Sequence, residues 1–322
     1  MLIIAGKLCR PGRRPDEIAL VGPICDRTRL RWSVRSATGR DCAGRSDLRP
    51  DYIELVRIAR FAHAKGMSFG VVEGEPEAGP QGLTVAEITG HPFGQITFSG
   101  VRWALSDVRL LSPILPSKVV CVGRNYAEHA AEHGNEVPKE PLLFLKPSTS
   151  VIGPRDAIRL PEFSKQVEHE AELAVVIGAP GARRADRAAA ERAIFGFTCA
   201  NDVTARDLQR YDSQWTRAKG FDSFCPIGPW ITTGLDVTDL EIRCEVGRDP
   251  EEMEVRQLGR TRDMVFDVPA LVSYVSHVMT LLPGDIVLTG TPAGVSPITD
   301  GDTVAVRIEG IGELANPVVS AN

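Results

Sequence analysis

The chain has 322 residues, 43% of them hydrophobic, and its 42 acidic and 37 basic side chains leave a formal charge of −5 at pH 7. A chain of this length can bury a sizeable core, so we expect a globular protein with one large and one smaller domain. The mixed charge argues against nucleic acid as a partner, and no apolar run approaches the roughly 18–20 residues of a membrane span.

The seven cysteines are scattered, odd in number and never spaced as Cys-x-x-Cys. This pattern favours neither a disulfide framework nor a thiolate metal site, and it is typical of a reducing compartment. Only Leu2–Ala5 form an apolar run before Lys7, which is too short for a signal-peptide core. The sequence therefore predicts a cytoplasmic protein without a membrane partner.

The first 55 residues differ from the rest of the chain. They combine broken hydrophobic periodicity and repeated Pro and Gly with ten arginines, at positions 10, 13, 14, 27, 29, 31, 35, 40, 45 and 49. Such a composition favours disorder over a packed core. A basic nucleic-acid arm is one alternative, but we expect residues 1–55 to be a poorly ordered leader, or an over-extended gene start, that carries no chemistry.

Removing residues 1–55 should therefore be silent, because the first credible strand begins near Val56. A chain that starts at Val56 should match the full chain in solubility and in turnover. Insoluble or inactive protein would show instead that the leader packs on the catalytic domain.

Residues 56–113 show short alternating apolar segments separated by Gly and Pro, among them Ile58–Ala62 and Ser68–Glu73. This spacing predicts a small N-terminal β domain. The segment Leu110–Pro116 contains two prolines, each of which biases its predecessor away from helix. We expect an extended linker there and a catalytic domain over residues 114–322.

The larger domain is mostly strands and turns with a few helices. One helix is predicted from Arg187 to Phe195, with Asp186 as N-cap and Gly196 as its stop. Another should open at Asp267 and present an apolar face that includes Val278. Strands are expected at Ile286–Thr289 and Thr303–Ile308. These elements predict an α+β fold that is mainly β.

Three carboxylates carry most of the functional information. Glu170 and Glu172 precede the buried-strand pattern Leu173–Ile177, so they should point to one face, roughly 6–7 Å apart. A solvated strand end is one explanation; the other is a hard-cation site completed by Asp202. Oxygen ligands favour Mg²⁺, Mn²⁺ or Ca²⁺ over zinc.

A second constellation holds His129 and Glu132, which lie three apart if Tyr126–Glu132 is helical. A carboxylate bonded to one imidazole nitrogen orients the ring and raises its basicity, as a general base acting on water requires. A surface His–Glu pair is the alternative. Glu128 and His133 are also near, so the pairing is not unique.

Weaker signals come from two further segments. Arg206 and Gln209 follow Asp202 on a short predicted helix, and Lys219 could supply a positive charge nearby. The strand that leads into Gly290 and Thr291 should present backbone N–H groups and a hydroxyl to a substrate carboxylate or carbonyl.

Together these segments resemble the fumarylacetoacetate hydrolase family over about Ser117–Val318. The motifs occur in family order: Gly123–Tyr126 with His129, Phe144–Pro147, Glu170–Leu173, Asn201–Asp207, Lys219–Asp222 and Thr289–Gly294. The module from Val56 resembles the N-terminal domain of bacterial members described as 2-hydroxyhepta-2,4-diene-1,7-dioate isomerases.

The resemblance implies a twisted β-roll with flanking helices, assembled as a homodimer. It also implies one Mg²⁺ or Mn²⁺ on Glu170, Glu172 and Asp202, and a His129–Glu132 dyad on a short lid. Substrate contacts are implied for Arg206, Gln209, Lys219 and Thr291.

The function expected on these grounds is a Mg²⁺-dependent hydrolase that cleaves C–C bonds of acylpyruvate or fumarylpyruvate-type 2-oxo acids through a metal-bound enolate, as in aromatic catabolism. Lys219 would stabilise the oxyanion. An isomerase or decarboxylase of 2-hydroxy-diene-dioates or oxaloacetate on the same site is the alternative among enzymes. A metal-binding module without catalysis is the alternative from another class.

Overall fold

The computed structural model describes residues 18–21, 33–36, 55–74, 82–132 and 134–320, and the chain divides into two units, Met1–Leu55 and Val56–Asn322. In the first unit, β1 (Ile18–Val21) pairs antiparallel with β2 (Ser33–Ser36). The predicted poor order of the leader otherwise lies outside the described residues. No helix within the described ranges is both long and apolar enough to cross a bilayer.

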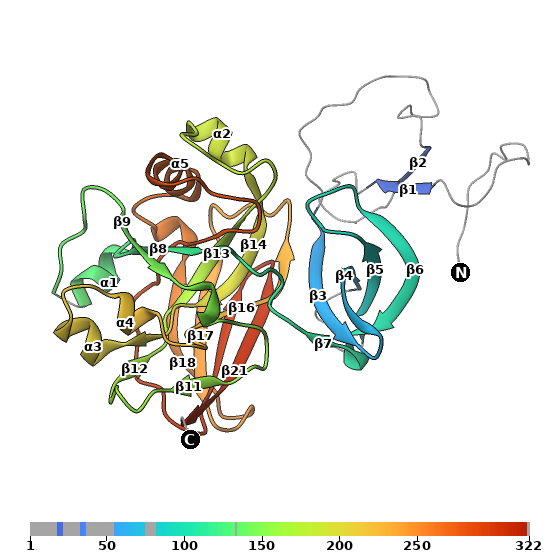
Figure 1. Cartoon of the computed structure of the whole chain (residues 1–322). Helices are drawn as coiled ribbons and strands as arrows, with labels where there is room; N and C mark the ends of the chain where they lie inside the picture. The colour runs from blue at the N-terminus through green and yellow to red at the C-terminus, as the bar shows by residue number, and fades with distance from the viewer. Residues whose placement is uncertain (1–17, 22–32, 37–54, 75–81, 133, 321–322) are drawn as a thin grey trace, which may run out of the picture. The chain divides into compact units, whose positions relative to one another are not determined.

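The second unit is built on a large and a smaller sheet (Figure 1). In its described part, the large sheet has twelve strands in the order β6-β5-β4-β3-β16-β14-β13-β19-β8-β9, with β7 on β3 and β10 on β16. These strands are β3 (Arg57–His63), β4 (Gly66–Glu73), β5 (Thr84–Thr89), β6 (Thr97–Ala104), β7 (Arg109–Leu110), β8 (Val119–Gly123), β9 (Leu142–Lys146), β10 (Val151–Ile152), β13 (Ala171–Ile177), β14 (Ile194–Asn201), β16 (Cys225–Thr232) and β19 (Ile286–Leu288).

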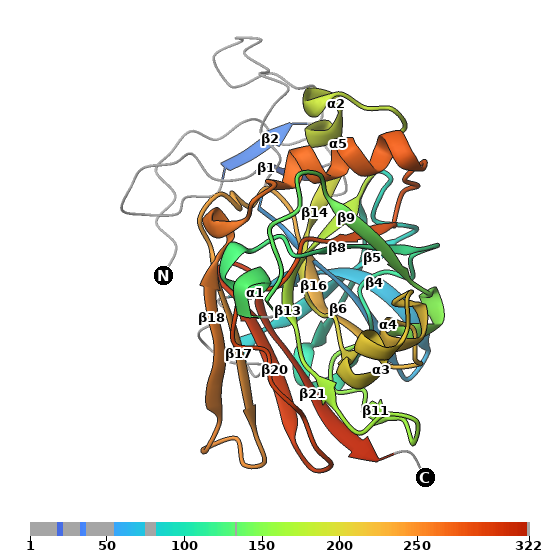
Figure 2. The ribbon, with the colours of Figure 1, turned by 90° about the vertical axis from the view of Figure 1, so that its left-hand side faces the viewer.

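The smaller sheet has the order β11-β21-β20-β17-β18, and Figure 2 shows its four long strands side by side. Its strands are β11 (Ile158–Leu160), β17 (Glu241–Gly247), β18 (Glu254–Arg260), β20 (Thr303–Ile308) and β21 (Gly312–Ser320), and a separate pair is formed by β12 (Val167–Glu168) and β15 (Thr204–Ala205). The helices are α1 (Ala127–Glu132), α2 (Arg187–Arg192), α3 (Arg206–Tyr211), α4 (Thr216–Lys219) and α5 (Val268–Val278). The predicted α+β, mainly β class is confirmed.

The strands of the predicted β module form one end of the large sheet. They join it because β3 pairs with β16, with Ile58 opposite Ile231. Phe61 of β3 packs in one apolar cluster with Trp230 of β16. Residues 111–118 contain no strand or α-helix, as expected of the linker, although Ile114 is buried. The module thus continues the sheet of the larger domain, and the boundary at 113/114 stays a prediction.

The central strand β13 is buried along its whole length. Leu173 and Val175 face the core shared with the smaller sheet and α5, whereas Ala174 and Val176 face a second cluster with β8 and β19. A strand covered on both faces needs apolar side chains at successive positions, which explains the unbroken run in the sequence. Glu172 belongs by alternation to the face of Ala174 and Val176.

Two helix ends differ from the prediction. The caps are correct: the carboxylates of Asp186 and Asp267 accept backbone N–H bonds at the starts of α2 and α5. However, α2 ends at Arg192, because the chain from Ile194 already pairs in β14. Val278, expected on the apolar face of α5, is the last residue of the helix and is exposed.

Candidate active site

Three carboxylates meet where β13 begins and β14 ends. The two strands are antiparallel, with Glu172 opposite Ala200, so Asp202, which follows β14, lies beside the residue that precedes β13. The Asp202 N–H donates to the carbonyl oxygen of Glu170 at 2.9 Å. Carboxylate oxygens of Glu170, Glu172 and Asp202 lie within 4.8 Å of one another and are buried. Strand pairing thus brings together acids that are distant in sequence.

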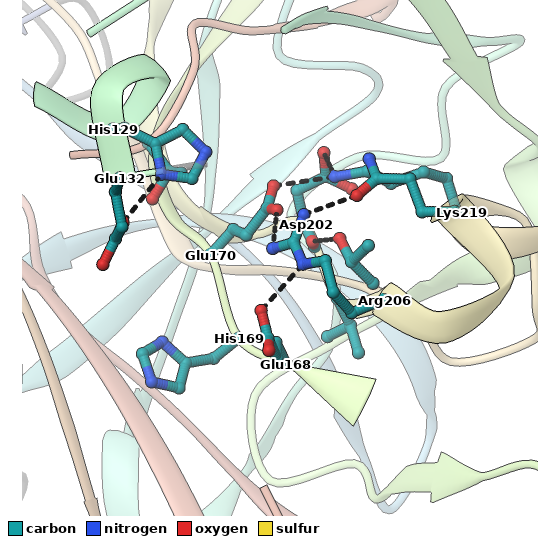
Figure 3. A network of polar contacts seen from close by, with 12 residues as sticks. His129, Glu132, Glu168, His169, Glu170, Asp202, Arg206 and Lys219 are labelled. Carbon is teal, nitrogen blue, oxygen red and sulfur yellow. Dashed lines mark hydrogen bonds and ion pairs between the residues drawn. The ribbon is translucent and has the colours of Figure 1, made fainter. Parts of the chain in front are cut away.

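Two buried lysines compensate part of this charge. Lys219 Nζ lies 2.7 Å from both Glu170 Oε2 and Asp202 Oδ2 (Figure 3), and Lys146 Nζ lies 2.5 Å from Asp202 Oδ1. Burial lowers the pKa of Lys219, but the charges of Asp202 and Glu170 outweigh it and raise the pKa above its ordinary value. Lys146 lies in the motif Phe144–Pro147, but no role was predicted for it from the sequence; the available signal was a lysine at the end of the apolar run of β9.

Glu172 is the least compensated of the three acids. Burial raises the pKa of its carboxyl well above the ordinary value, and the charges of Asp202 and Glu170 add to this effect. Burial acts the same way on Glu170, but the charges of Lys219 and Arg206 hold the pKa of that carboxyl below its ordinary value. The site therefore lacks a positive charge beside Glu172.

The donor set fits one hard divalent cation. Ligand oxygens at about 2.0–2.6 Å from Mg²⁺, Mn²⁺ or Ca²⁺ lie at most about 4–5 Å apart, which matches the 4.8 Å limit of the triad. The neighbouring thiols offer no competing site, because burial raises the pKa of Cys225 to about 12 and also raises that of Cys121. The residues present can thus hold a divalent ion through oxygen alone.

Replacing Lys146 by methionine should destabilise the metal-free protein. The substitution removes a cation whose exposed fraction is 0% and leaves Asp202 with one ion pair fewer. Urea denaturation should show a loss of about 3 kcal/mol in the free energy of unfolding, and adding Mn²⁺ should recover part of it. The exposed Lys65, replaced by methionine, is the control. Unchanged stability would contradict a role for Lys146 in holding Asp202.

Arg206 lines the site but is already bonded at all three guanidinium nitrogens. Nε donates to Glu168 at 2.7 Å, and Nη2 donates to Glu170 at 2.6 Å (Figure 3). Nη1 donates to the side-chain oxygen of Gln209 at 2.6 Å. Arg206 therefore positions Glu170 and Gln209, and the direct substrate contact expected from the sequence stays a prediction.

The Gly-rich turn after β19 also serves the acids. Gly290 has φ +95°, and a Cβ there would meet a neighbouring side chain at 2.8 Å, so the position requires glycine. Its N–H donates to Glu172 Oε2 at 2.6 Å. This is one of the backbone N–H groups that were expected from the sequence to bind substrate. The Thr291 hydroxyl donates to the Ala171 carbonyl at 2.8 Å.

Gln257 of β18 links the start of β13 to the turn after β19. Its local sequence gives no sign of this role. Its Oε1 accepts from the Ala171 N–H at 2.9 Å and lies 3.0 Å from His169 Nδ1. Its Nε2 donates to the Thr291 hydroxyl at 2.8 Å. Burial lowers the pKa of His169 to about 4, so this imidazole is neutral at pH 7. The network fixes the start of β13 against the turn at Thr291.

His129 and Glu132 form the pair expected from their spacing. His129 Nδ1 lies 3.3 Å from Glu132 Oε2, both on α1, and Figure 3 shows them on the Glu170 side of the site. The Gly294 N–H donates to Glu132 at 3.2 Å. The carboxylate is thus held from two sides and can orient the imidazole.

One cavity of about 270 Å³ connects these groups. Of the predicted site residues, it is lined by His129, Glu170, Glu172, Asp202, Arg206, Gln209, Lys219 and Thr291. Glu132 and Gly290 are absent from its lining, and each bonds a residue that does line it. The structure therefore brings every predicted site residue into the cavity wall or into contact with it.

Two family models match this chain. A family model described as fumarylacetoacetate (FAA) hydrolase C-terminal matches residues 118–319, and one described as Rv2993c-like, N-terminal matches residues 56–113. Protein Rv2993c of Mycobacterium tuberculosis is 54% identical, over 82% of this chain and 98% of its own length. The mitochondrial oxaloacetate tautomerase FAHD2A of Bos taurus is 45% identical, over 70% of this chain and 77% of its own.

Solved structures are similar as well. A 2-hydroxyhepta-2,4-diene-1,7-dioate isomerase from Mycobacterium marinum is 51% identical, with a TM-score of 0.76 and coverage of 83% of this chain and 99% of that one. A fumarylpyruvate hydrolase from Pseudomonas aeruginosa, solved with Mn²⁺ and pyruvate, is 32% identical, with a TM-score of 0.60 and coverage of 65% and 91%.

Proposed function

Because the chain belongs to the fumarylacetoacetate hydrolase family, whose members are enzymes, we propose that it is a divalent-metal-dependent hydrolase of acylpyruvate or fumarylpyruvate-type 2-oxo acids. The observation that carries the proposal is the single cavity shared by the carboxylate triad, Lys219 and His129. A related hydrolase solved with Mn²⁺ and pyruvate supports both the type of ion and the type of ligand. Mg²⁺ is the ion we propose first, with Mn²⁺ as its substitute.

Glu170, Glu172 and Asp202 would hold the ion, which supplies a Lewis acid for the two oxygens of a 2-oxo acid and for the charge that develops on them. Lys219 keeps its positive charge beside Glu170 and Asp202 and can stabilise an oxyanion in the cavity. The amide of Gln209, fixed by Arg206, offers substrate a neutral donor.

In the proposed reaction, His129 removes a proton from water while Glu132 stabilises the charged imidazole. The hydroxide adds to the distal carbonyl carbon of the acylpyruvate, and the bond between that carbon and C3 of the pyruvyl part breaks. The electron pair stays on the pyruvyl part as an enolate, which takes up a proton to give pyruvate. The other product is the carboxylic acid, so one water is consumed for each substrate.

A second candidate is an isomerase or tautomerase of a 2-hydroxy-diene-dioate or of oxaloacetate. It is favoured by a specific observation: relatives above 40% identity include a protein named as an isomerase and one named as an oxaloacetate tautomerase. In that case His129 would move a proton between carbon and oxygen without adding water. Oxaloacetate decarboxylation shares the same enolate and stays part of this alternative.

Product analysis separates these activities. The protein is incubated with Mg²⁺ or Mn²⁺ and, in turn, acetylpyruvate, fumarylpyruvate, 2-hydroxyhepta-2,4-dienedioate and oxaloacetate, and the products are identified by NMR in deuterated water. Pyruvate with an equimolar carboxylic acid supports the hydrolase. Deuterium exchange or isomerisation without cleavage supports the second candidate, and turnover of none of the four contradicts both.

The homodimer and the cytoplasmic location stay predictions from the sequence. Light scattering coupled to size-exclusion chromatography would test the first, and fractionation of cells would test the second.

A further inference from the structure

Two of the cations that line the cavity, Arg124 and Arg210, have no acid beside them among the residues that the structure describes, and only Arg210 has another side-chain partner there. Arg206 and Lys219 are paired with the carboxylates, and Arg210 at the edge donates to the neutral amide of Gln166. The remaining cation of the lining, Arg124, makes no hydrogen bond or ion pair with any other residue in the described part of the chain. An arginine that lines a cavity without a partner can bind an anion that enters it.

The backbone at Arg124 is held in an unfavourable conformation. Its φ of +60° lies in the left-handed region, which side chains other than Asn, Asp and Gly rarely adopt. The next residue, Asn125, is buried and donates to the carbonyl oxygens of Thr289 at 2.7 Å and Phe266 at 3.0 Å. Glycine would adopt this φ without strain. The presence of arginine at a strained position therefore indicates a function for its side chain.

Charge balance gives a second, independent reason. Four buried carboxylates meet three buried cations at the site: Glu168, Glu170, Glu172 and Asp202 against Lys146, Arg206 and Lys219. These groups sum to one negative charge, so binding of an ion with two positive charges would leave one positive charge. The carboxylate of a 2-oxo acid then neutralises the site, and Arg124 contributes one further positive charge that a second substrate carboxylate would match.

We propose that Arg124 is a specificity-determining residue that binds a carboxylate at the far end of the substrate, so that the preferred substrates are dicarboxylic 2-oxo acids. The inference rests on the proposed function, because it takes the 2-oxo acid end to lie at the triad. The cavity of about 270 Å³ is slightly smaller than the roughly 300–1,000 Å³ usual for ligand pockets, which suits a small diacid. The guanidinium fork matches a carboxylate through two parallel bonds.

Kinetics on a matched pair of substrates tests this role. Fumarylpyruvate carries a second carboxylate, whereas acetylpyruvate does not. Arg124→Gln should lower kcat/KM for fumarylpyruvate by about 10- to 100-fold, mainly through KM, and should change kcat/KM for acetylpyruvate by less than about twofold. Arg124→Lys should fall between, because an ammonium lacks the planar fork. Equal losses on both substrates would overturn the proposal.

Two controls keep the test independent of folding. Arg155 has a similar φ of +64° but is exposed and does not line the cavity, so Arg155→Gln should leave both values of kcat/KM unchanged. Arg124→Gly removes the charge and relieves the backbone, so it should lose the same preference without a lower melting temperature. A stable Arg124→Gly variant that keeps its preference for fumarylpyruvate would overturn the proposal.

Binding separates this inference from the proposed reaction. Calorimetry on the Mn²⁺-loaded protein compares 2-oxoglutarate with 2-oxopentanoate, which has the same chain length but no second carboxylate. A preference for 2-oxoglutarate that Arg124→Gln abolishes supports the inference even if no acylpyruvate is cleaved, in which case only the hydrolase fails. Cleavage of acylpyruvates with equal binding of the two acids retains the hydrolase and overturns the role of Arg124.

Discussion

Replacing Glu172 by glutamine should abolish turnover and the stabilisation of the protein by Mn²⁺. Glu172 faces Asp202 and Glu170 without a cation of its own, so a divalent ion stabilises the site most through this carboxylate. Removing the carboxylate should remove most of that stabilisation. EDTA should have the same effect on the unmodified protein. Activity assays and the melting temperature with and without Mn²⁺ measure both effects, and the exposed Glu191, replaced by glutamine, is the control.

The metal-free protein should tolerate this substitution. The folded-state pKa of Glu172 lies above its unfolded value, so this group costs stability as the pH rises above the unfolded value. A neutral amide removes that cost, and at pH 7 the Glu172→Gln protein should melt at the same temperature as the metal-free original or higher. Full activity in EDTA, or Mn²⁺ stabilisation that survives the substitution, would contradict the metal assignment.

His129→Ala and Glu132→Gln should each lower turnover of an acylpyruvate by roughly 10²- to 10⁴-fold, the usual contribution of a positioned general base. The two side chains lie 3.3 Å apart and act on one water, so the double variant should lose little more than the worse single variant. Steady-state kinetics of the three variants measures this. Mn²⁺ binding by calorimetry should persist, because the triad is intact.

Glu128 is the matched control for Glu132, since it lies on the same helix and is exposed. Glu128→Gln should keep normal turnover. Losses that multiply in the double variant would indicate separate roles for His129 and Glu132, and normal turnover in both singles would make them a surface pair. If hydrolysis disappears while decarboxylation of oxaloacetate rises, His129 serves the hydrolytic reaction alone.

Local sequence patterns were sufficient to predict the mainly β class, the family and the cluster of three acids. These depend on local information: Glu170 and Glu172 two apart before an apolar run, caps at Asp186 and Asp267, and motifs in family order. Strand alternation then places both glutamates on one face whatever the rest of the fold does. The His129–Glu132 contact was readable for the same reason, because a helix brings residues three apart together.

Which charged groups contact the acids depends on the tertiary fold. Lys146 comes from β9 and Gln257 from β18, and both strands are far from the acids in the sequence. Long-range packing brings their side chains to Asp202 and to the Ala171 N–H. Arg206 and Gly290 also donate hydrogen bonds to Glu170 and Glu172, which the sequence did not indicate. Their predicted contacts with substrate stay predictions. Buried carboxylates must be paired or hydrogen-bonded, and which groups are near enough to do so depends on long-range packing, which no local pattern contains.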